Sequence, residues 1–199
     1  MATSVEHLCR LGIHAVGIDS SVDALTRARK RNGDLPLIQA RCEHFPFAPE
    51  SMGGVLAECC LSVVPELAAA LVECWRVLVS NGRLAITDLY ARNAGVTVPV
   101  DGALPRCLAG IRGRESWTAF LENAGFQLDI LEDKSDVLRG FMARLIMEQG
   151  SPLRLWTEAA ADDNEARRID QVVKAMHPGY FLLVASKRTT NRRPKELFS

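Results

Sequence analysis

The chain has 199 residues, of which 48% are hydrophobic, and its 24 basic side chains balance its 24 acidic ones. That composition suits one compact domain with a sizeable core. Zero net charge argues against a general binder of nucleic acids or membrane surfaces. The sequence lacks both the roughly 18 to 20 consecutive apolar residues of a membrane span and the pattern of a secretory signal. We therefore expect a cytoplasmic protein with no nucleic-acid or membrane partner.

The six cysteines show no Cys-x-x-Cys spacing and have no pair of histidines nearby. Structural zinc sites depend on such patterns, and disulfide frameworks are typical of smaller and less apolar secreted chains. We therefore expect neither a metal site nor a disulfide framework.

Strand-like and helix-like segments alternate over the first 88 residues. Strand patterns lie at 13–18, 35–40, 54–61 and 83–88, and helix patterns at 4–11, 22–31 and 65–79. Such alternation is typical of a parallel sheet with helices on both faces. The predicted fold class is α/β, with a Rossmann-like and mostly parallel sheet.

The alternation changes after residue 88. A Gly- and Pro-rich loop at 91–106 precedes a helix at 115–124 and a strand at 126–131. Apolar spacing predicts a helix over 135–149, followed by a polar helix at 158–170 and a last, antiparallel strand at 179–187. The basic end, 188–199, is expected to be a solvated and flexible tail.

Asp19 lies at the carboxyl end of the strand at 13–18, directly before a helix. Ligands of open α/β sheets bind beyond the carboxyl ends of the strands, where an acidic residue commonly holds the hydroxyls of a ribose. We predict this role for Asp19, with Ser20 as N-cap of the next helix. The alternative is that Asp19 is only a helix-capping carboxylate.

Several stretches resemble class I S-adenosylmethionine (SAM)-dependent methyltransferases, most closely the small-molecule branch called type 11. These stretches are 17–21, 40–47, 55–62 and the run Glu-x-x-Arg-Val-Leu-x-x-x-Gly-Arg-Leu at 73–84. A nicotinamide-dependent dehydrogenase would share the acid-tipped strand but fits that run less well. The resemblance covers about residues 4–131 and the last strand, and it implies methyl transfer from SAM to a small-molecule acceptor.

The resemblance also implies roles for individual positions. Asp19 would bind the ribose hydroxyls with Ser20 beside it, and Cys42 and Glu43 fall where the family's adenine-edge loop lies. Glu58 falls at the tip of the family's fourth strand, which faces the methyl group. For Glu43 and Glu58, a solvated loop acid is an equally weighted alternative.

Two departures from the family pattern bear on cofactor binding. The glycine-rich turn that normally precedes the acidic residue by about 20 positions would fall before Met1, so we expect strand one and its glycine loop to be missing. Arg41 replaces an acid near the adenine, which removes adenine recognition or substitutes guanidinium stacking, and Met52-Gly53 replaces an aromatic-Asp pair. A truncated enzyme and a non-catalytic remnant unable to bind SAM both stay open.

Two cysteines resemble positions of arsenite methyltransferases. Cys59 falls at the tip of the fourth strand, and Cys107 lies in a Cys-Leu-Ala-Gly segment after the fifth. Thiolates suit a soft centre such as trivalent arsenic, so both are candidate catalytic residues of an arsenite methyltransferase-like enzyme. No third thiolate is evident, and for Cys107 a buried apolar role is the favoured alternative.

The resemblance suggests one methyltransferase-like domain over residues 1–187. Within it, 91–112 and 132–178 would be loop and helical additions on the substrate side. The helix at 135–149 would either cover the sheet or form the surface of a homodimer.

Overall fold

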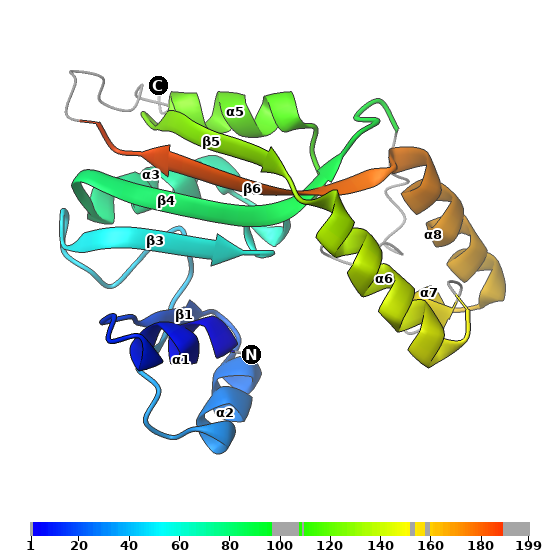
Figure 1. The fold of residues 1–199 in the computed structure, drawn as a ribbon, viewed down its shortest axis with the longest axis horizontal. Coiled ribbons are helices and arrows are strands. Elements are labelled where there is room, and N and C mark those ends of the chain that lie inside the picture. The colour runs from blue at the N-terminus through cyan, green and yellow to red at the C-terminus, as the bar shows by residue number, and fades with distance from the viewer. Residues whose placement is uncertain (1, 97–107, 109, 152–153, 158–159, 189–199) are drawn as a thin grey trace. The chain divides into compact units, whose positions relative to one another are not determined.

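The computed structural model describes residues 2–96, 108, 110–151, 154–157 and 160–188 (Figure 1). The chain divides into two compact units, an N-terminal unit at Met1–Ala48 and a C-terminal unit at Pro49–Ser199. The predicted tail beyond Arg188 and the segment 97–107 of the predicted loop lie outside the described residues. The prediction of one domain over 1–187 stays a prediction. Over the described ranges, no helix is both long enough and apolar enough to cross a membrane.

The N-terminal unit contains two helices and a two-stranded parallel sheet. Its elements are α1 (Thr3–Arg10), β1 (Gly17–Asp19), α2 (Val22–Arg31) and β2 (Leu37–Gln39). β1 pairs with β2 in parallel, with Gly17 opposite Leu37. A Cβ atom at Gly17 would meet the side chains of Leu37 and Val5, so a glycine at this position lets α1 and β2 pack closely on β1. α2 buries Leu25 and Ala28.

The C-terminal unit is built on a four-stranded sheet of order β3-β4-β6-β5. Its elements are β3 (Met52–Glu58), η1 (Leu61–Val63), α3 (Leu67–Val77), β4 (Leu78–Ala91), α5 (Arg114–Asn123), β5 (Gln127–Asp133), α6 (Ser135–Gln149), α7 (Arg154–Thr157), α8 (Asp163–Met176) and β6 (Pro178–Ser186). β3 is parallel to β4, whereas β6 is antiparallel to both β4 and β5.

These elements confirm the predicted α/β class and the antiparallel last strand. The C-terminal sheet is less parallel than the alternation over residues 1–88 indicates, because β6 lies between β4 and β5 and runs against both. β1 and β3, for their part, belong to separate hydrogen-bonded sheets, and each has one strand neighbour among the described residues.

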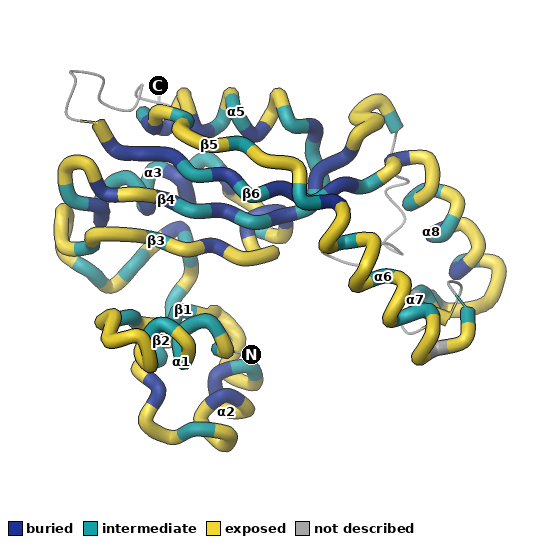
Figure 2. Tube along the Cα trace, viewed as in Figure 1, coloured by how far each residue is buried: buried dark blue, intermediate teal, exposed yellow. Residues whose placement is uncertain are grey.

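The core of the C-terminal unit follows the two-residue period of the central strands. Burial alternates along β6, where Phe181, Leu183 and Ala185 are all buried. Figure 2 shows the same concentration of buried residues along β4 and β6. α5 adds Trp117, whose ring meets the Phe181 ring edge-on with centroids 5.2 Å apart. The apolar pattern of the sequence therefore sets which face of the sheet α5 covers.

A polar network joins the ends of β4 and β5 to the start of α6. The hydroxyl of Tyr90 donates to Asp133 Oδ2 at 2.7 Å, and Arg92 donates to the same oxygen at 2.8 Å. The backbone N–H of Ser135 donates to Asp133 Oδ1 at 2.8 Å. Hydrogen bonds from Ser135, Tyr90 and Arg92 hold the pKa of Asp133 well below its usual range. The carboxylate thereby fixes where α6 leaves the sheet.

The helical addition between β5 and β6 is close to the prediction. α6 has the predicted bounds, whereas the helix predicted over 158–170 is α8 at Asp163–Met176, because Asp162 is its N-cap and accepts from the N–H of Glu165 at 2.8 Å. Val137 and Phe141 on α6 are more than half exposed. The homodimer through this helix stays a prediction.

Substitution of Gly179 tests the packing around Tyr90. A Cβ atom at this buried position would overlap the Tyr90 ring. We expect Gly179→Ala to lower the free energy of unfolding by about 1–3 kcal/mol, the usual cost of overpacking. Urea unfolding followed by tryptophan fluorescence measures this, since Trp75 and Trp117 both lie in the C-terminal unit. Gly53→Ala is the control, because no atom lies within 4 Å of a Cβ there. Equal midpoints for the two variants would contradict the prediction.

Candidate functional site

Asp19 is the last residue of β1, and its side chain is exposed. Its Oδ1 accepts a hydrogen bond from the N–H of Ser21 at 2.8 Å. The predicted cap is wrong by one residue: Ser21, not Ser20, is the N-cap of α2, because the helix begins at Val22 and Ser21 Oγ accepts from the N–H of Ala24 at 3.2 Å. Asp19 thus supports the helix start with one oxygen, as the capping alternative supposes. Its exposed carboxylate is at the same time available to a ligand.

The end of β2 lies beside this carboxylate. The N–H of Ala40 donates to the backbone oxygen of Asp19 at 3.3 Å, and the side-chain amide of Gln39 donates to the backbone oxygen of Ser20 at 3.4 Å. Parallel strands present their carboxyl ends at one edge of a sheet. The N-terminal unit therefore brings Asp19 and Ser20 to the edge where the loop holding Cys42 and Glu43 begins.

Glu43 is buried in that loop, with a relative exposure of 8%. Arg41 pairs with Glu43 Oε1 at 2.9 Å, and the Cys42 thiol donates to Oε2 at 3.5 Å. The hydrogen bond from Arg41 lowers the pKa of Glu43, while burial and the neighbouring Glu43 raise the pKa of Cys42 to about 11. Glu43 is thus buried and paired with Arg41, not solvated as the alternative of a loop acid supposes. The thiol of Cys42 is neutral at physiological pH.

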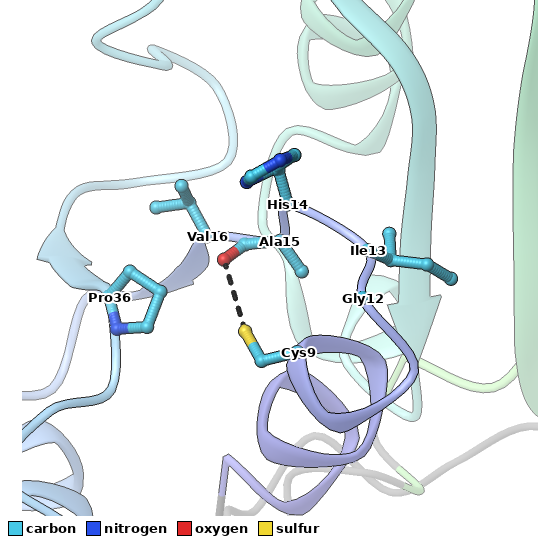
Figure 3. Close-up of a pocket in the computed structure, with 7 residues that line it drawn as sticks. All are labelled: Cys9, Gly12, Ile13, His14, Ala15, Val16 and Pro36. Carbon is cyan, nitrogen blue, oxygen red and sulfur yellow. Dashed lines mark hydrogen bonds between the residues drawn. The ribbon is translucent and has the colours of Figure 1, made fainter.

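A surface hollow of about 340 Å³ lies elsewhere in the N-terminal unit (Figure 3). The residues that line it surround the chain between α1 and β1: Cys9, Gly12, Ile13, His14, Ala15, Val16 and Pro36. The Cys9 thiol donates to the backbone oxygen of Ala15 at 3.8 Å. This lining includes none of the predicted site residues, so the hollow is separate from the Asp19 edge.

A second strand-end cluster lies in the C-terminal unit. Glu58 ends β3 and is exposed, and Cys59 follows it with a φ of 49°. That left-handed conformation is uncommon for a residue other than glycine. The N–H of Cys59 donates to the backbone oxygen of Thr87 at 2.7 Å, and its thiol donates to the hydroxyl of Tyr180 at 3.5 Å. The end of β3 is thus joined to β4 and β6 through Cys59.

Asp88 supports this turn from β4 and is 1% exposed. Its Oδ2 accepts from the N–H of Ser62 at 2.9 Å, and its Oδ1 accepts from the N–H of Leu89 at 2.8 Å. Burial raises the pKa of Asp88, against the opposing effect of the hydrogen bonds from Ser62. The carboxylate satisfies an N–H group in η1, which begins two residues after Cys59.

Cys107, the other candidate catalytic residue, lies outside the described residues. Gly110 lies close to η1, because a Cβ atom there would overlap the backbone of Ser62. Among the described residues, no group of three or more His, Cys, Asp or Glu side chains is arranged to hold a metal ion.

Our sequence reasoning missed Asp88 and Tyr180. Asp88 carried a usable signal, since an acid at the carboxyl end of an apolar strand had already singled out Asp19. The sequence has no comparable signal for Tyr180. Its position beside Cys59 depends on the register of β6 against β4, in which Tyr180 lies opposite Leu89.

Replacing Asp88 tests whether it holds this turn. In Asp88→Asn an amide N–H₂ must face one of the two backbone N–H donors, which leaves buried donors without an acceptor. We expect the unfolding free energy at pH 7 to fall by about 1–3 kcal/mol, measured by urea unfolding. Glu122→Gln is the control, because it removes one carboxylate charge from an exposed position of α5. A loss no larger than that of the control would contradict the supporting role of Asp88.

The fold and the two strand-end clusters together define an α/β protein of the nucleotide-binding type, with polar groups at the carboxyl ends of parallel strands. The family model described as a methyltransferase domain matches residues 2–86. Over that segment the match bears out the resemblance to class I SAM-dependent methyltransferases.

Three similar proteins show the range of that relationship. An arsenite methyltransferase of Halobacterium salinarum is 29% identical over 122 residues, which is 57% of this chain and 31% of that protein. A phosphatidylethanolamine N-methyltransferase of Cereibacter sphaeroides is 31% identical over 100 residues, which is 47% of this chain and 49% of that protein. The chain thus spans about half or less of these curated relatives.

The third is a solved structure, phosphoethanolamine N-methyltransferase 2 of Haemonchus contortus in complex with phosphomonomethylethanolamine and S-adenosylhomocysteine. It superposes with a TM-score of 0.66 at 13% identity, covering 94% of this chain and 46% of that one. At that identity the likeness shows the methyltransferase fold alone.

Proposed function

We propose that this chain binds SAM and transfers its methyl group to a small nucleophilic acceptor in the cytoplasm, without nucleic-acid or membrane partners. The observation that carries the proposal is the exposed carboxylate of Asp19. It lies at the carboxyl end of β1, inside the segment that matches the methyltransferase domain. Ligands of α/β folds bind at such strand ends, where an acid can bind both hydroxyls of a ribose.

The residues at the Asp19 edge fit the nucleoside half of SAM. Asp19 would accept from the ribose hydroxyls, and the loop fixed by the Arg41–Glu43 pair would border the adenine, with Cys42 beside it. A non-catalytic remnant that does not bind SAM is the competing proposal.

Bound SAM would supply a methyl carbon made electrophilic by the sulfonium. The protein then has mainly to orient the acceptor and exclude water, which is where most of the rate enhancement of such a transfer arises. By the resemblance, the acceptor side is the strand end of Glu58 and Cys59. A thiolate, an amine or arsenite needs no dedicated base there, because each is already a good nucleophile.

Calorimetric titration with SAM tests the proposal. We expect saturable binding to the whole chain, and Asp19→Ala should weaken it by about ten- to a hundredfold, because hydrogen bonds between the ribose and a charged group are lost. Asp34→Ala, at an exposed acid of the same unit, should bind like the unaltered protein. Absence of heat at millimolar SAM would support the remnant, and equal affinity of Asp19→Ala would refute the ribose role.

A second candidate is arsenite as the acceptor. It is favoured by the presentation of Cys59, whose left-handed backbone sets an exposed thiol at the end of β3, and by similarity to an arsenite methyltransferase over 122 residues. Thiolates are ligands that trivalent arsenic prefers. Cys107 would be the second thiolate.

A methylation assay with arsenite and SAM decides this candidate. We expect Cys59→Ser and Cys107→Ser each to reduce turnover at least tenfold, because a hydroxyl is a poor ligand for a soft centre. Cys9→Ser, at an exposed thiol in the N-terminal unit, is the control. Unchanged turnover in both test variants would remove the arsenite hypothesis while leaving methyl transfer to another acceptor in place.

A further inference from the structure

The Cys59 thiol has one defined polar neighbour on the sheet, the phenol of Tyr180. The Sγ atom and the phenol oxygen are 3.5 Å apart, although the two residues are separated by 121 positions. Tyr180 is half-buried and stands on the face of β6 opposite to Phe181 and Leu183, which enter the core. The contact therefore depends on strand pairing rather than on local sequence.

Both partners are held by the backbone. Cys59 is fixed in its left-handed conformation by the hydrogen bond from its N–H to the oxygen of Thr87. The N–H of Tyr180 donates to the hydroxyl of Ser135 at 3.1 Å. The pairing of β4 with β6 in register from Arg83 to Ala91 therefore fixes where the two side chains start from the backbone.

We propose that Tyr180 is a positioning residue that holds the Cys59 sulfur at the carboxyl end of β3 and donates a hydrogen bond to it once the thiol has ionised. The neutral thiol donates to the phenol oxygen, as in this structure. When the thiol proton leaves to solvent, the phenol O–H turns to the sulfur and stabilises the thiolate.

Thr87 favours Tyr180 as the donor in the hydrogen bond to Cys59. Its hydroxyl forms a hydrogen bond that lowers the pKa of Tyr180, whereas burial and Cys59 raise it, with a resulting pKa of about 12. A threonine hydroxyl that donates to the phenol oxygen leaves the phenol proton for the sulfur. Tyr180 thus stays protonated at pH 8, and it can act as the donor.

The other groups facing Cys59 oppose its ionisation. Partial burial is the largest effect and raises the pKa of Cys59; Tyr180 lowers it, and the charges of Asp88 on β4 and Glu58 on β3 raise it. Tyr180 is therefore the neighbour that favours the thiolate against two carboxylates. The inference deepens the proposed acceptor role of Cys59, and it rests on that role for its functional meaning.

Alkylation by iodoacetamide measures how readily the Cys59 thiol ionises, and it needs neither cofactor nor acceptor. An S–C bond forms, iodide leaves and the thiol proton goes to solvent, so the rate follows the thiolate. We expect Tyr180→Phe to slow labelling of Cys59 about three- to tenfold at pH 8 and to move its pH profile upward by about one unit. Peptide mass spectrometry of the full chain, in a Cys60→Ser background, assigns the label, with exposed Cys9 as internal reference.

Tyr90→Phe is the matched control, because it removes a phenol hydroxyl that donates to Asp133 and does not contact Cys59. Its Cys59 profile should be unchanged. Equal or faster labelling in Tyr180→Phe would overturn the inference. Should that variant not fold, Thr87→Val decides: slower labelling of Cys59 supports the inference and an unchanged rate overturns it.

The result of the labelling experiment can be distinguished from the result of the SAM titration. A shifted Cys59 profile in a chain that does not bind SAM would sustain the Tyr180 pairing and refute methyl transfer. Binding of SAM together with an unshifted profile would refute the pairing alone.

Discussion

The C-terminal unit depends on the pairing of β4 along both of its edges. β3 runs parallel to it on one side and β6 antiparallel on the other, in register from Arg83 onward. An interior strand has its backbone groups hydrogen-bonded on both sides, so β4 is held in place from both of its edges. Thr87, Asp88 and Tyr90 follow one another near the carboxyl end of β4. Through them the same pairing positions the Cys59 turn and the start of α6.

Three carboxylates show how burial and donors together set a pKa. The hydrogen bond from Arg41 lowers the pKa of Glu43, and hydrogen bonds from Ser135 and Tyr90 lower that of exposed Asp133. Asp88 is 1% exposed, and there desolvation outweighs its neutral donors and raises the pKa. Arg41 therefore belongs to the loop's structure, whatever it contributes to adenine recognition.

The sequence supports more of the fold than of the site. The apolar periods of 135–149 and 179–187 predict α6 and β6 closely. In β6 burial accounts for the pattern, whereas Val137 and Phe141 of α6 are exposed. The N-cap of α2 is harder to predict, because Ser20 and Ser21 are chemically alike. Only the residue at which the helix begins decides which of them is the cap. The Cys59–Tyr180 contact and the burial of Glu43 arise from long-range register and from loop geometry. Neither has a local signature in the chain.

The backbone conformation of Cys59 supports the proposal that this strand end has a functional role. A left-handed backbone at a residue other than glycine costs on the order of 1 kcal/mol, and glycine would adopt a φ of 49° without that cost. Asp88 carries a similar disadvantage, since an anion is desolvated to satisfy two backbone donors. At Cys59, stability alone would be served better by glycine. Strain and buried charge that meet at the end of one strand, beside an exposed thiol, are the features expected where a fold gives up stability for chemistry.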